Sequence, residues 1–121
     1  MKMDPLKLYQ YPKCSTCKAA LQFLSERGLR FEVVDISKTP PSPDELRRMI
    51  ALTGAIRPLF NTSGRSYREG RFSETLEGMS IEAAIDALTR DGMLVKRPFL
   101  LGQELGLLGF KIDEWQKLTA G

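Results

Sequence analysis

Two cysteines in one short motif are the residues of this chain best suited to redox chemistry. Cys14 and Cys17 are its only cysteines, spaced Cys-x-x-Cys, and they stand where an apolar, strand-like run ends and an amphipathic helix begins. Unpaired N–H groups and the positive end of the helix dipole favour a thiolate at such a helix N-terminus. We therefore expect a redox site here, with Lys13 and Lys18 adding positive charge nearby.

The order of the two cysteines suggests a role for each. Cys14, at the start of the helix, is the candidate nucleophile. Cys17 follows about one turn later, close enough to resolve a mixed disulfide or a sulfenic acid on Cys14. The alternatives are two structural cysteines or half of a zinc site. Zinc needs about four ligands, and the chain has no histidine and no third cysteine, so only a site shared between two chains would supply them. We expect no metal and no cofactor.

Length and composition indicate one soluble domain, residues 1–121. With 42% apolar residues the chain can bury a core without disulfides. Its net charge is +3, but basic and acidic residues are interspersed, so direct nucleic-acid binding is not indicated. Met1–Pro5 carries no apolar signal sequence, and no run is long enough to span a membrane. We expect a cytoplasmic protein without a membrane partner, and in that reducing compartment the cysteine pair is catalytic or sensing.

The elements around the motif predict a parallel βαβ unit. Residues 6–10 favour a strand, residues 15–27 form a helical pattern closed by Gly28, and residues 31–36 favour a second strand. Two strands joined by one helix run parallel. The cysteine motif then lies at the carboxyl end of the first strand, where open α/β sheets bind ligands.

The rest of the chain predicts helices first and strands later. A capping box of Ser42 and Glu45 starts a helix at Pro43 that Gly54 ends. The further expected elements are short helical turns and loops over 57–71, a helix from Ser80 to about 91–92, a strand begun by Pro98, its hairpin partner over 105–110 after a turn around Gly102, and a terminal helix over 113–118. The large aromatic residues are expected in the core: Phe60, Phe72, Phe99, Phe110 and Trp115.

A Cys-x-x-Cys motif after the first strand and a proline before the third resemble the thioredoxin fold, an α/β fold with a mixed four-stranded sheet. Residues 36–96 would be a helical insertion, as in the superfamily of arsenate reductase (ArsC), Spx and MgsR. The matching motifs run nearly from end to end: Tyr11-Pro12-Lys13-Cys14, the Pro-Pro-Ser-x-x-Glu-Leu of 40–46, Phe60 to Gly64, Tyr67-Arg68-Glu69, Asp91 to Leu94, Lys96-Arg97-Pro98 and Gly109-Phe110-Lys111. The resemblance is greatest to the YusI-like branch.

The resemblance also implies roles for site residues. Cys14 would attack an oxyanion or a disulfide, Arg97 would face the oxyanion, and Pro98 would be cis. Arg57 stands where arsenate reductases carry a second arginine, and Lys111 stands where they carry a third. A guanidinium can hold two oxygens of an anion, whereas a lysine offers only a point charge. The alternative is that these cations are solvated surface residues, which we favour for the remaining basic residues of that region: Arg65, Arg68 and Arg71.

Two hypotheses for the function follow. One is a thiol-dependent reductase that takes electrons from glutaredoxin and glutathione or from thioredoxin. The other is a redox-responsive regulator of the Spx and MgsR kind that binds RNA polymerase. An anion site would bring Arg57, Arg97 and Lys111 together around Cys14, whereas a regulator would show an exposed patch elsewhere.

Overall fold

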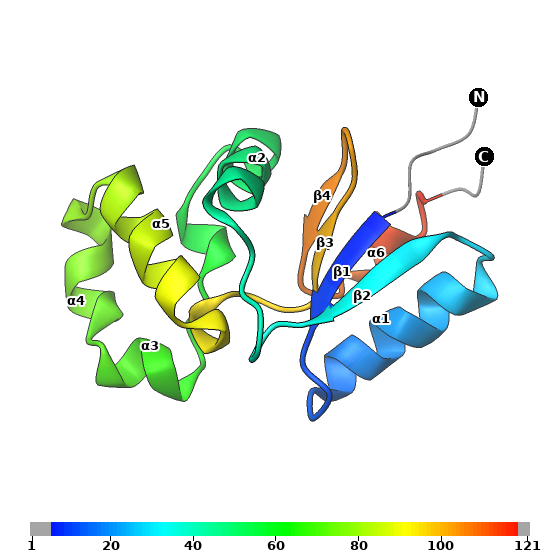
Figure 1. Ribbon diagram of the computed structural model, residues 1–121, viewed down its shortest axis with the longest axis horizontal. Coiled ribbons are helices and arrows are strands. Elements are labelled where there is room, and N and C mark those ends of the chain that lie inside the picture. The colour runs from blue at the N-terminus through cyan, green and yellow to red at the C-terminus, as the bar shows by residue number, and fades with distance from the viewer. Residues whose placement is uncertain (1–5, 119–121) are drawn as a thin grey trace.

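The computed structural model describes residues 6–118 and shows a four-stranded sheet with helices on both faces (Figure 1). The strands are β1 (Leu6–Gln10), β2 (Phe31–Asp35), β3 (Phe99–Leu101) and β4 (Gly106–Leu108). The helices are α1 (Ser15–Glu26), α2 (Pro43–Thr53), α3 (Arg65–Glu69), α4 (Phe72–Thr75), α5 (Ile81–Arg90) and α6 (Ile112–Trp115), with 3₁₀ turns η1 (Arg57–Leu59), η2 (Leu76–Gly78) and η3 (Gly92–Leu94).

The sheet has the strand order β2-β1-β3-β4, so β1 is one of its two central strands. β1 pairs in parallel with β2, whereas β3 is antiparallel to both β1 and β4. All of α2 to α5 lies between β2 and β3 in the chain. This arrangement confirms the predicted α/β class: a thioredoxin-like mixed sheet with a helical insertion. That residues 1–121 form a single domain stays a prediction, because Met1–Pro5 and residues 119–121 lie outside the described residues.

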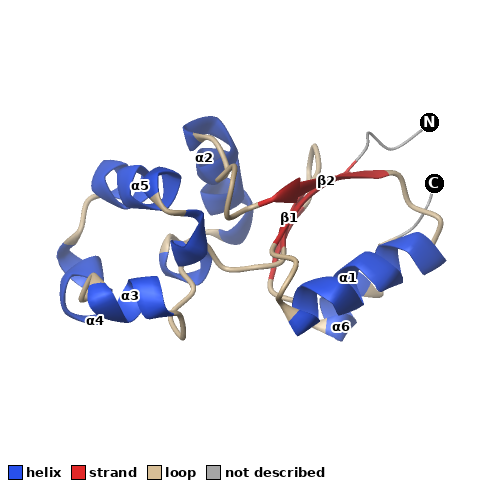
Figure 2. Cartoon of the chain, turned by 60° about the horizontal axis from the view of Figure 1, so that its bottom comes forward, coloured by secondary structure: helices blue, strands red, loops and turns tan. Residues whose placement is uncertain are grey.

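One face of the sheet is covered by α1 and α6, which lie side by side in Figure 2. The buried residues between these helices and the sheet are Leu6, Leu8, Ala20, Leu24, Leu29, Leu100, Trp115 and Leu118. α1 follows the predicted limits closely, with Gly28 in the left-handed conformation (φ 69°) after its last turn. This packing fixes the start of α1, and with it the cysteine motif, against the carboxyl end of β1.

The other face packs against the insertion, which begins with α2. The predicted capping box is present: the Glu45 N–H donates to Ser42 Oγ, and the Ser42 N–H donates to Glu45 Oε1. Leu46 and Met49 of α2 are fully buried in the core of this face. The short turns predicted over 57–71 appear as η1, α3 and the loops between them, and the helix capped by Ser80 appears as α5.

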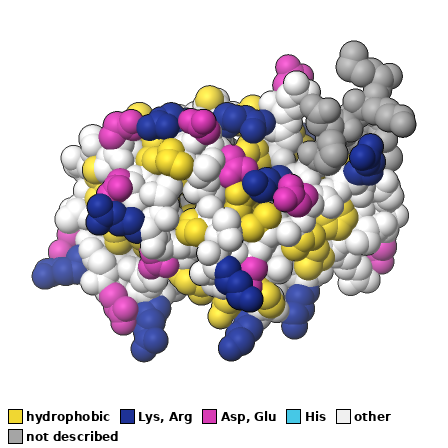
Figure 3. Space-filling model, in the orientation of Figure 1, with side chains coloured by type: hydrophobic (Ala, Val, Ile, Leu, Met, Phe, Trp, Pro, Cys, Tyr) yellow, Lys and Arg dark blue, Asp and Glu magenta, His cyan; other side chains and the backbone are white. Residues whose placement is uncertain are grey.

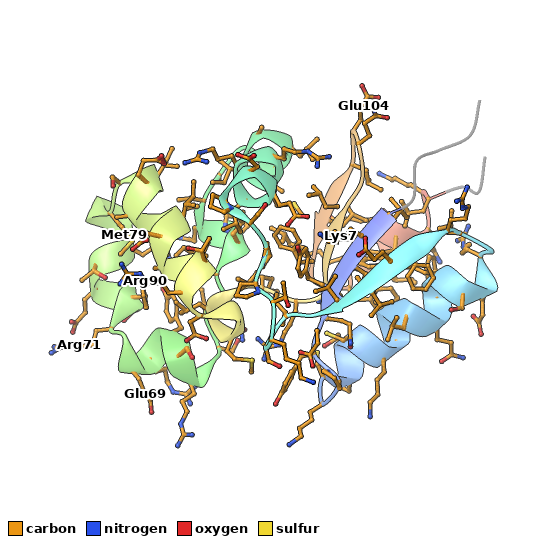
Figure 4. All side chains as sticks on the ribbon, in the orientation of Figure 1. Lys7, Glu69, Arg71, Met79, Arg90 and Glu104 are labelled. Carbon is orange, nitrogen blue, oxygen red and sulfur yellow. The ribbon has the colours of Figure 1, made fainter. Side chains whose placement is uncertain are left out.

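A charged cluster ties α2 to the middle of the sheet. Glu45 accepts hydrogen bonds from the hydroxyl of Tyr9 (2.5 Å) and forms an ion pair with Lys7 (3.0 Å). Burial and the bond to Glu45 raise the pKa of Tyr9 to about 12. Burial acts to raise the pKa of Glu45 too, but the hydrogen bonds from Tyr9 and Ser42 outweigh it and the net pKa is lowered. Figure 4 shows Lys7 over the strands.

Changing Glu45 to glutamine should therefore lower the free energy of unfolding by about 1.5–3 kcal/mol, the range for hydrogen bonds to a charged group. Because the pKa of Glu45 is lowered in the folded state, its contribution is present above the unfolded pKa and is lost as the pH falls through the folded one. Urea unfolding at several pH values measures this. The destabilisation should be full at pH 7 and shrink in acid; a loss independent of pH would contradict the account.

A close approach of backbone segments explains one glycine of the Asp91–Leu94 motif. A Cβ on Gly92 would overlap the carbonyl oxygen of Ile36, just after β2. We expect Gly92→Ala to lower the free energy of unfolding by about 2 kcal/mol, as overpacking against backbone does. The control is Gly78→Ala, where a Cβ meets nothing within 4 Å. Urea unfolding of both variants compares them, and equal stabilities would contradict the packing.

The structure shortens two predicted elements near the C-terminus. β4 ends at Leu108, because Gly109 takes a left-handed conformation (φ 72°). α6 ends at Trp115 and not at Leu118, because the N–H groups of Lys117 and Leu118 bond three residues back, as in tighter turns. Of the aromatic residues expected in the core, Phe60, Phe99 and Trp115 are fully buried, whereas Phe72 and Phe110 are half-buried.

Charge on the surface is mixed, as the sequence indicates. Figure 3 shows Lys and Arg side chains interspersed with Asp and Glu over the face seen there. Within residues 6–118, no helix has the length and apolar character needed to cross a bilayer. The described residues also contain no cluster of three or more His, Cys, Asp or Glu side chains that could hold a metal ion.

Candidate functional site

Cys14 occupies the N-cap position of α1. Its backbone is extended (φ −97°, ψ 118°), and its Sγ accepts a hydrogen bond from the N–H of Cys17 at 3.3 Å. The hydroxyl of Thr16 lies 3.3 Å from the same sulfur, also in hydrogen-bond contact. The Cys17 N–H is one of the free backbone donors of the first helical turn, so the predicted position of the pair at a helix N-terminus is confirmed.

The two thiols differ in exposure and in acidity. Partial burial acts to raise the pKa of Cys14, but hydrogen bonds from Cys17 and Thr16, together with the charge of Arg97, outweigh it and lower the pKa. Cys17 is fully buried, and burial together with the neighbouring Cys14 raises its pKa to about 12. Both are free thiols in this structure. Of the two thiols, Cys14 is therefore the easier one to deprotonate.

Arg97 supplies the cation beside the pair. Its Nη1 donates to the carbonyl oxygen of Met93 at 3.2 Å, and its guanidinium lies over the ring of Tyr11, 5.3 Å from the centroid. Its Nε is buried and has no hydrogen-bond partner among residues 6–118. The Arg97–Pro98 peptide bond is cis, which confirms the expectation drawn from the resemblance.

The sequence indicated a different source of positive charge. Lys13 and Lys18 were expected to stabilise the thiolate, but both side chains are exposed, where solvent screens their charge. The cation that lowers the pKa of Cys14 is Arg97, which comes from the segment before β3. Tertiary packing brings it to the site, so neighbours in the sequence could not reveal it.

Arg57 and Lys111 both line one groove. The groove, of about 740 Å³, lies between the insertion and β4, and Lys96 is a third cation in it. The lining of this groove includes neither cysteine of the pair nor Arg97. Cys14, Cys17 and Arg97 thus lie together at the start of α1, and Arg57 and Lys111 line the groove beside β4. Substrate binding by Arg57, Lys111 and Pro98 stays a prediction.

Sequence reasoning missed three residues, two beside the cysteine pair and one in the groove. Thr16 bonds to the Cys14 sulfur, Tyr11 stacks on Arg97, and Lys96 lines the groove. Thr16 could have been found, because a hydroxyl inside the Cys-x-x-Cys loop is within reach of the first sulfur. For Tyr11 and Lys96, the only indication in the sequence was that both belong to motifs shared with the ArsC superfamily. The basic residues expected on the surface are indeed exposed: Arg65, Arg68 and Arg71.

The lowered pKa of Cys14 predicts a pH profile of alkylation. The rate with iodoacetamide should reach half its maximum below about pH 8.5, the value of an unperturbed thiol. Arg97→Gln should move this midpoint upward, because the cation favouring the thiolate is lost, and Arg97→Lys should move it less. Rates measured by mass spectrometry from pH 5 to 10 test this. A midpoint at or above that of a free thiol would contradict the site electrostatics.

Comparison with known proteins places the chain in a family. The sequence model of the ArsC family matches residues 9–118, almost the whole chain. The chain belongs to the ArsC family. An ArsC family related protein from Bacteroides fragilis has the same fold, with a TM-score of 0.87, 38% identity and coverage of 97% of each chain.

The ArsC-family relatives include proteins of different kinds. The chain is 39% identical to the protein YusI of Bacillus subtilis, over 93% of this chain and 96% of that one. It is 30% identical to an arsenate reductase of Neisseria meningitidis, over 92% and 95% of the two chains. It is 26% identical to the global transcriptional regulator Spx of Streptococcus pyogenes, over 88% and 79%. Family membership is thus shown, while an enzyme and a regulator both stand among the relatives.

Proposed function

We propose that this ArsC-family chain is a thiol-dependent oxidoreductase in which Cys14 is the nucleophile and Cys17 the resolving thiol. One observation carries the proposal: the two sulfurs differ in the way that these roles require. Cys14 is partly exposed and its pKa is lowered, whereas Cys17 is buried with a pKa of about 12 and lies one turn behind it. A substrate therefore meets the more acidic, accessible thiol first and the buried thiol second.

With a disulfide as substrate, the Cys14 thiolate attacks one sulfur and the other sulfur leaves as a thiolate. The mixed disulfide removes the negative charge from Cys14. That charge and the hydrogen bond to Cys14 both help to raise the pKa of Cys17, so its thiol becomes easier to deprotonate at this step. Cys17 then gives up its proton, attacks Cys14 Sγ and expels the second thiolate. The resulting Cys14–Cys17 disulfide needs two electrons from an external thiol, such as glutathione with glutaredoxin, or thioredoxin.

With an oxyanion as substrate, the Cys14 thiolate bonds to the central atom and displaces a hydroxyl group, which leaves as water after taking a proton. Attack of Cys17 on Cys14 Sγ forms the disulfide and leaves the electron pair on the departing, reduced oxyanion. Arg97 lies beside the sulfur, and its free Nε–H is a donor without a partner among the described residues. A guanidinium placed there stabilises charge on the oxygens during transfer.

A coupled assay tests this function. Oxidation of NADPH is followed with arsenate, and separately with hydroxyethyl disulfide, each with the glutaredoxin and the thioredoxin recycling systems. Turnover above the background of the recycling enzymes is expected with at least one substrate. Absence of turnover in all four combinations, with Cys14 still open to alkylation, would refute the reductase.

A second candidate function is a redox-responsive regulator. It is favoured by the similarity to Spx, which covers 88% of this chain. In this case the Cys14–Cys17 disulfide would alter affinity for RNA polymerase and no substrate would turn over. Pull-down of purified RNA polymerase by the oxidised protein, by the reduced protein and by Cys14→Ser separates the two. Binding that depends on oxidation, without turnover in the coupled assay, would establish the regulator.

A further inference from the structure

The groove of about 740 Å³ that contains Arg57 and Lys111 runs beside β4, at the edge of the sheet. Its walls are the end of α2, η1 and α3 on the side of the insertion, and β4 with the start of α6 on the other. Figure 1 shows β4 as the outermost strand, facing α2. Three cations, Arg57, Lys96 and Lys111, line the groove against one carboxylate, Glu114.

Hydrogen bonds at both ends of β4 fix which way its backbone faces. The Gly102 N–H donates to the Leu105 carbonyl oxygen at 2.7 Å, and the Gly109 N–H donates to the Pro98 carbonyl oxygen at 2.9 Å. The C=O of Leu105 and the N–H of Gly109 therefore point toward the β3 side. In an antiparallel pair these inward positions alternate with outward ones.

Gly106 and Leu108 occupy the outward positions. They stand opposite Leu101 and Phe99 in the register, at pairs that exchange no hydrogen bonds. Their N–H and C=O groups point away from β3, and the described part of the chain holds no hydrogen-bond partner for them. Both residues line the groove. The groove thus offers two donors and two acceptors in the spacing of a strand.

The geometry points to a docking site where an extended, acidic segment of another protein adds as a strand to the edge of β4. The ladder would form at Gly106 and Leu108, and carboxylates of the segment would meet Arg57, Lys96 and Lys111. Strand addition of this kind takes affinity from main-chain bonds and selectivity from flanking side chains. The charges argue against a second copy of this chain, because a symmetric pairing of β4 edges would bring like cations together.

The alternative is that the cations only protect a short edge from aggregation, a common use of charge on edge strands. The probe that separates these readings is the peptide acetyl-Glu-Val-Glu-Val-Glu-amide. Its binding to the full chain is measured by calorimetry, and amide hydrogen exchange of Gly106 and Leu108 is followed by NMR. We expect saturable binding that slows exchange at both amides and weakens as salt is raised.

Two pairs of controls make the test specific. Lys96→Gln should weaken binding about two- to fivefold, the range for one exposed ion pair. Arg90→Gln removes an equal charge from an ion pair on α5, outside the groove, and should leave binding unchanged. Figure 4 shows Arg90 on the side of the insertion away from the sheet. Of two peptides N-methylated at alternate positions, one should lose binding and the other keep it, because only one set of amides faces β4.

Three results of the peptide experiments would overturn the proposed docking site. They are the absence of binding, binding without slower exchange at Gly106 and Leu108, and equal effects of the two methylation patterns. The second and third would mean an electrostatic contact only. A separate result, dimerisation through β4 in the free protein seen by analytical ultracentrifugation, would contradict the proposal that an acidic segment of another protein occupies this edge. None of these measurements depends on turnover, so the groove and the thiol chemistry can fail independently.

Discussion

Cys14→Ser should reduce turnover in the coupled assay by about 10³-fold or more, because it removes the nucleophile itself. A serine hydroxyl at the same N-cap can still accept the N–H of Cys17, so the helix should keep its start. The variant should therefore fold as the wild type does while losing activity. Stability is compared by urea unfolding and activity by NADPH oxidation with the substrate that the wild type turns over.

Cys17→Ser is the matched control. If Cys17 resolves the intermediate, this variant should form the covalent adduct and then stall, unless an external thiol such as glutathione releases it. Turnover should fall with thioredoxin recycling and depend on glutathione concentration. Residual activity of Cys14→Ser equal to that of Cys17→Ser would contradict the assigned roles.

Trp115→Ala should lower the free energy of unfolding by about 3–5 kcal/mol, the cost of emptying a buried aromatic site. Trp115 is fully buried and packs with edge-to-face geometry against Phe110 and Phe23, at centroid distances of 5.0 and 6.3 Å. Its Nε1 donates to the buried carbonyl oxygen of Gly109 at 3.0 Å. The residue therefore holds the segment after β4 against α1. Urea unfolding measures the loss.

Trp115→Phe separates packing from the hydrogen bond. It keeps most of the aromatic volume but leaves the Gly109 carbonyl oxygen unpaired, which costs about 1–3 kcal/mol. The expected order of stability is wild type, then Trp115→Phe, then Trp115→Ala. Alanine and phenylalanine variants of equal stability would show that the ring contributes little beyond its hydrogen bond.

Local signals in the sequence predicted most of the elements. The capping box of Ser42 and Glu45 and the left-handed glycines at 28 and 54 mark helix ends by short-range chemistry, and the structure has them in those roles. The limits of β4 and α6 were less accurate. They depend on the left-handed turn at Gly109 and on Trp115. Trp115 packs against Phe23 of α1 and bonds to Gly109, and such tertiary contacts leave no local pattern.

For the cysteine site too, the sequence predicted the local features and missed those that depend on tertiary packing. The Cys-x-x-Cys spacing predicts the N-cap position of Cys14, because one helical turn separates the two residues. The sequence could not give the burial of Cys17 or the approach of Arg97, since both depend on segments distant in the chain that meet at the start of α1. The sequence also could not show that Arg57 and Lys111 line one groove beside β4, because Arg57 comes from the insertion and Lys111 from the segment after β4.

The most direct test of the central claim is to expose the reduced protein to glutathione disulfide and weigh the products by intact mass spectrometry. We expect an internal Cys14–Cys17 disulfide in the wild type and one stable glutathione on Cys14 in Cys17→Ser. Cys14→Ser should form no adduct, because Cys17 is buried with a raised pKa. Modification of Cys14→Ser as fast as of Cys17→Ser would contradict this expectation, because either thiol could then serve as the nucleophile.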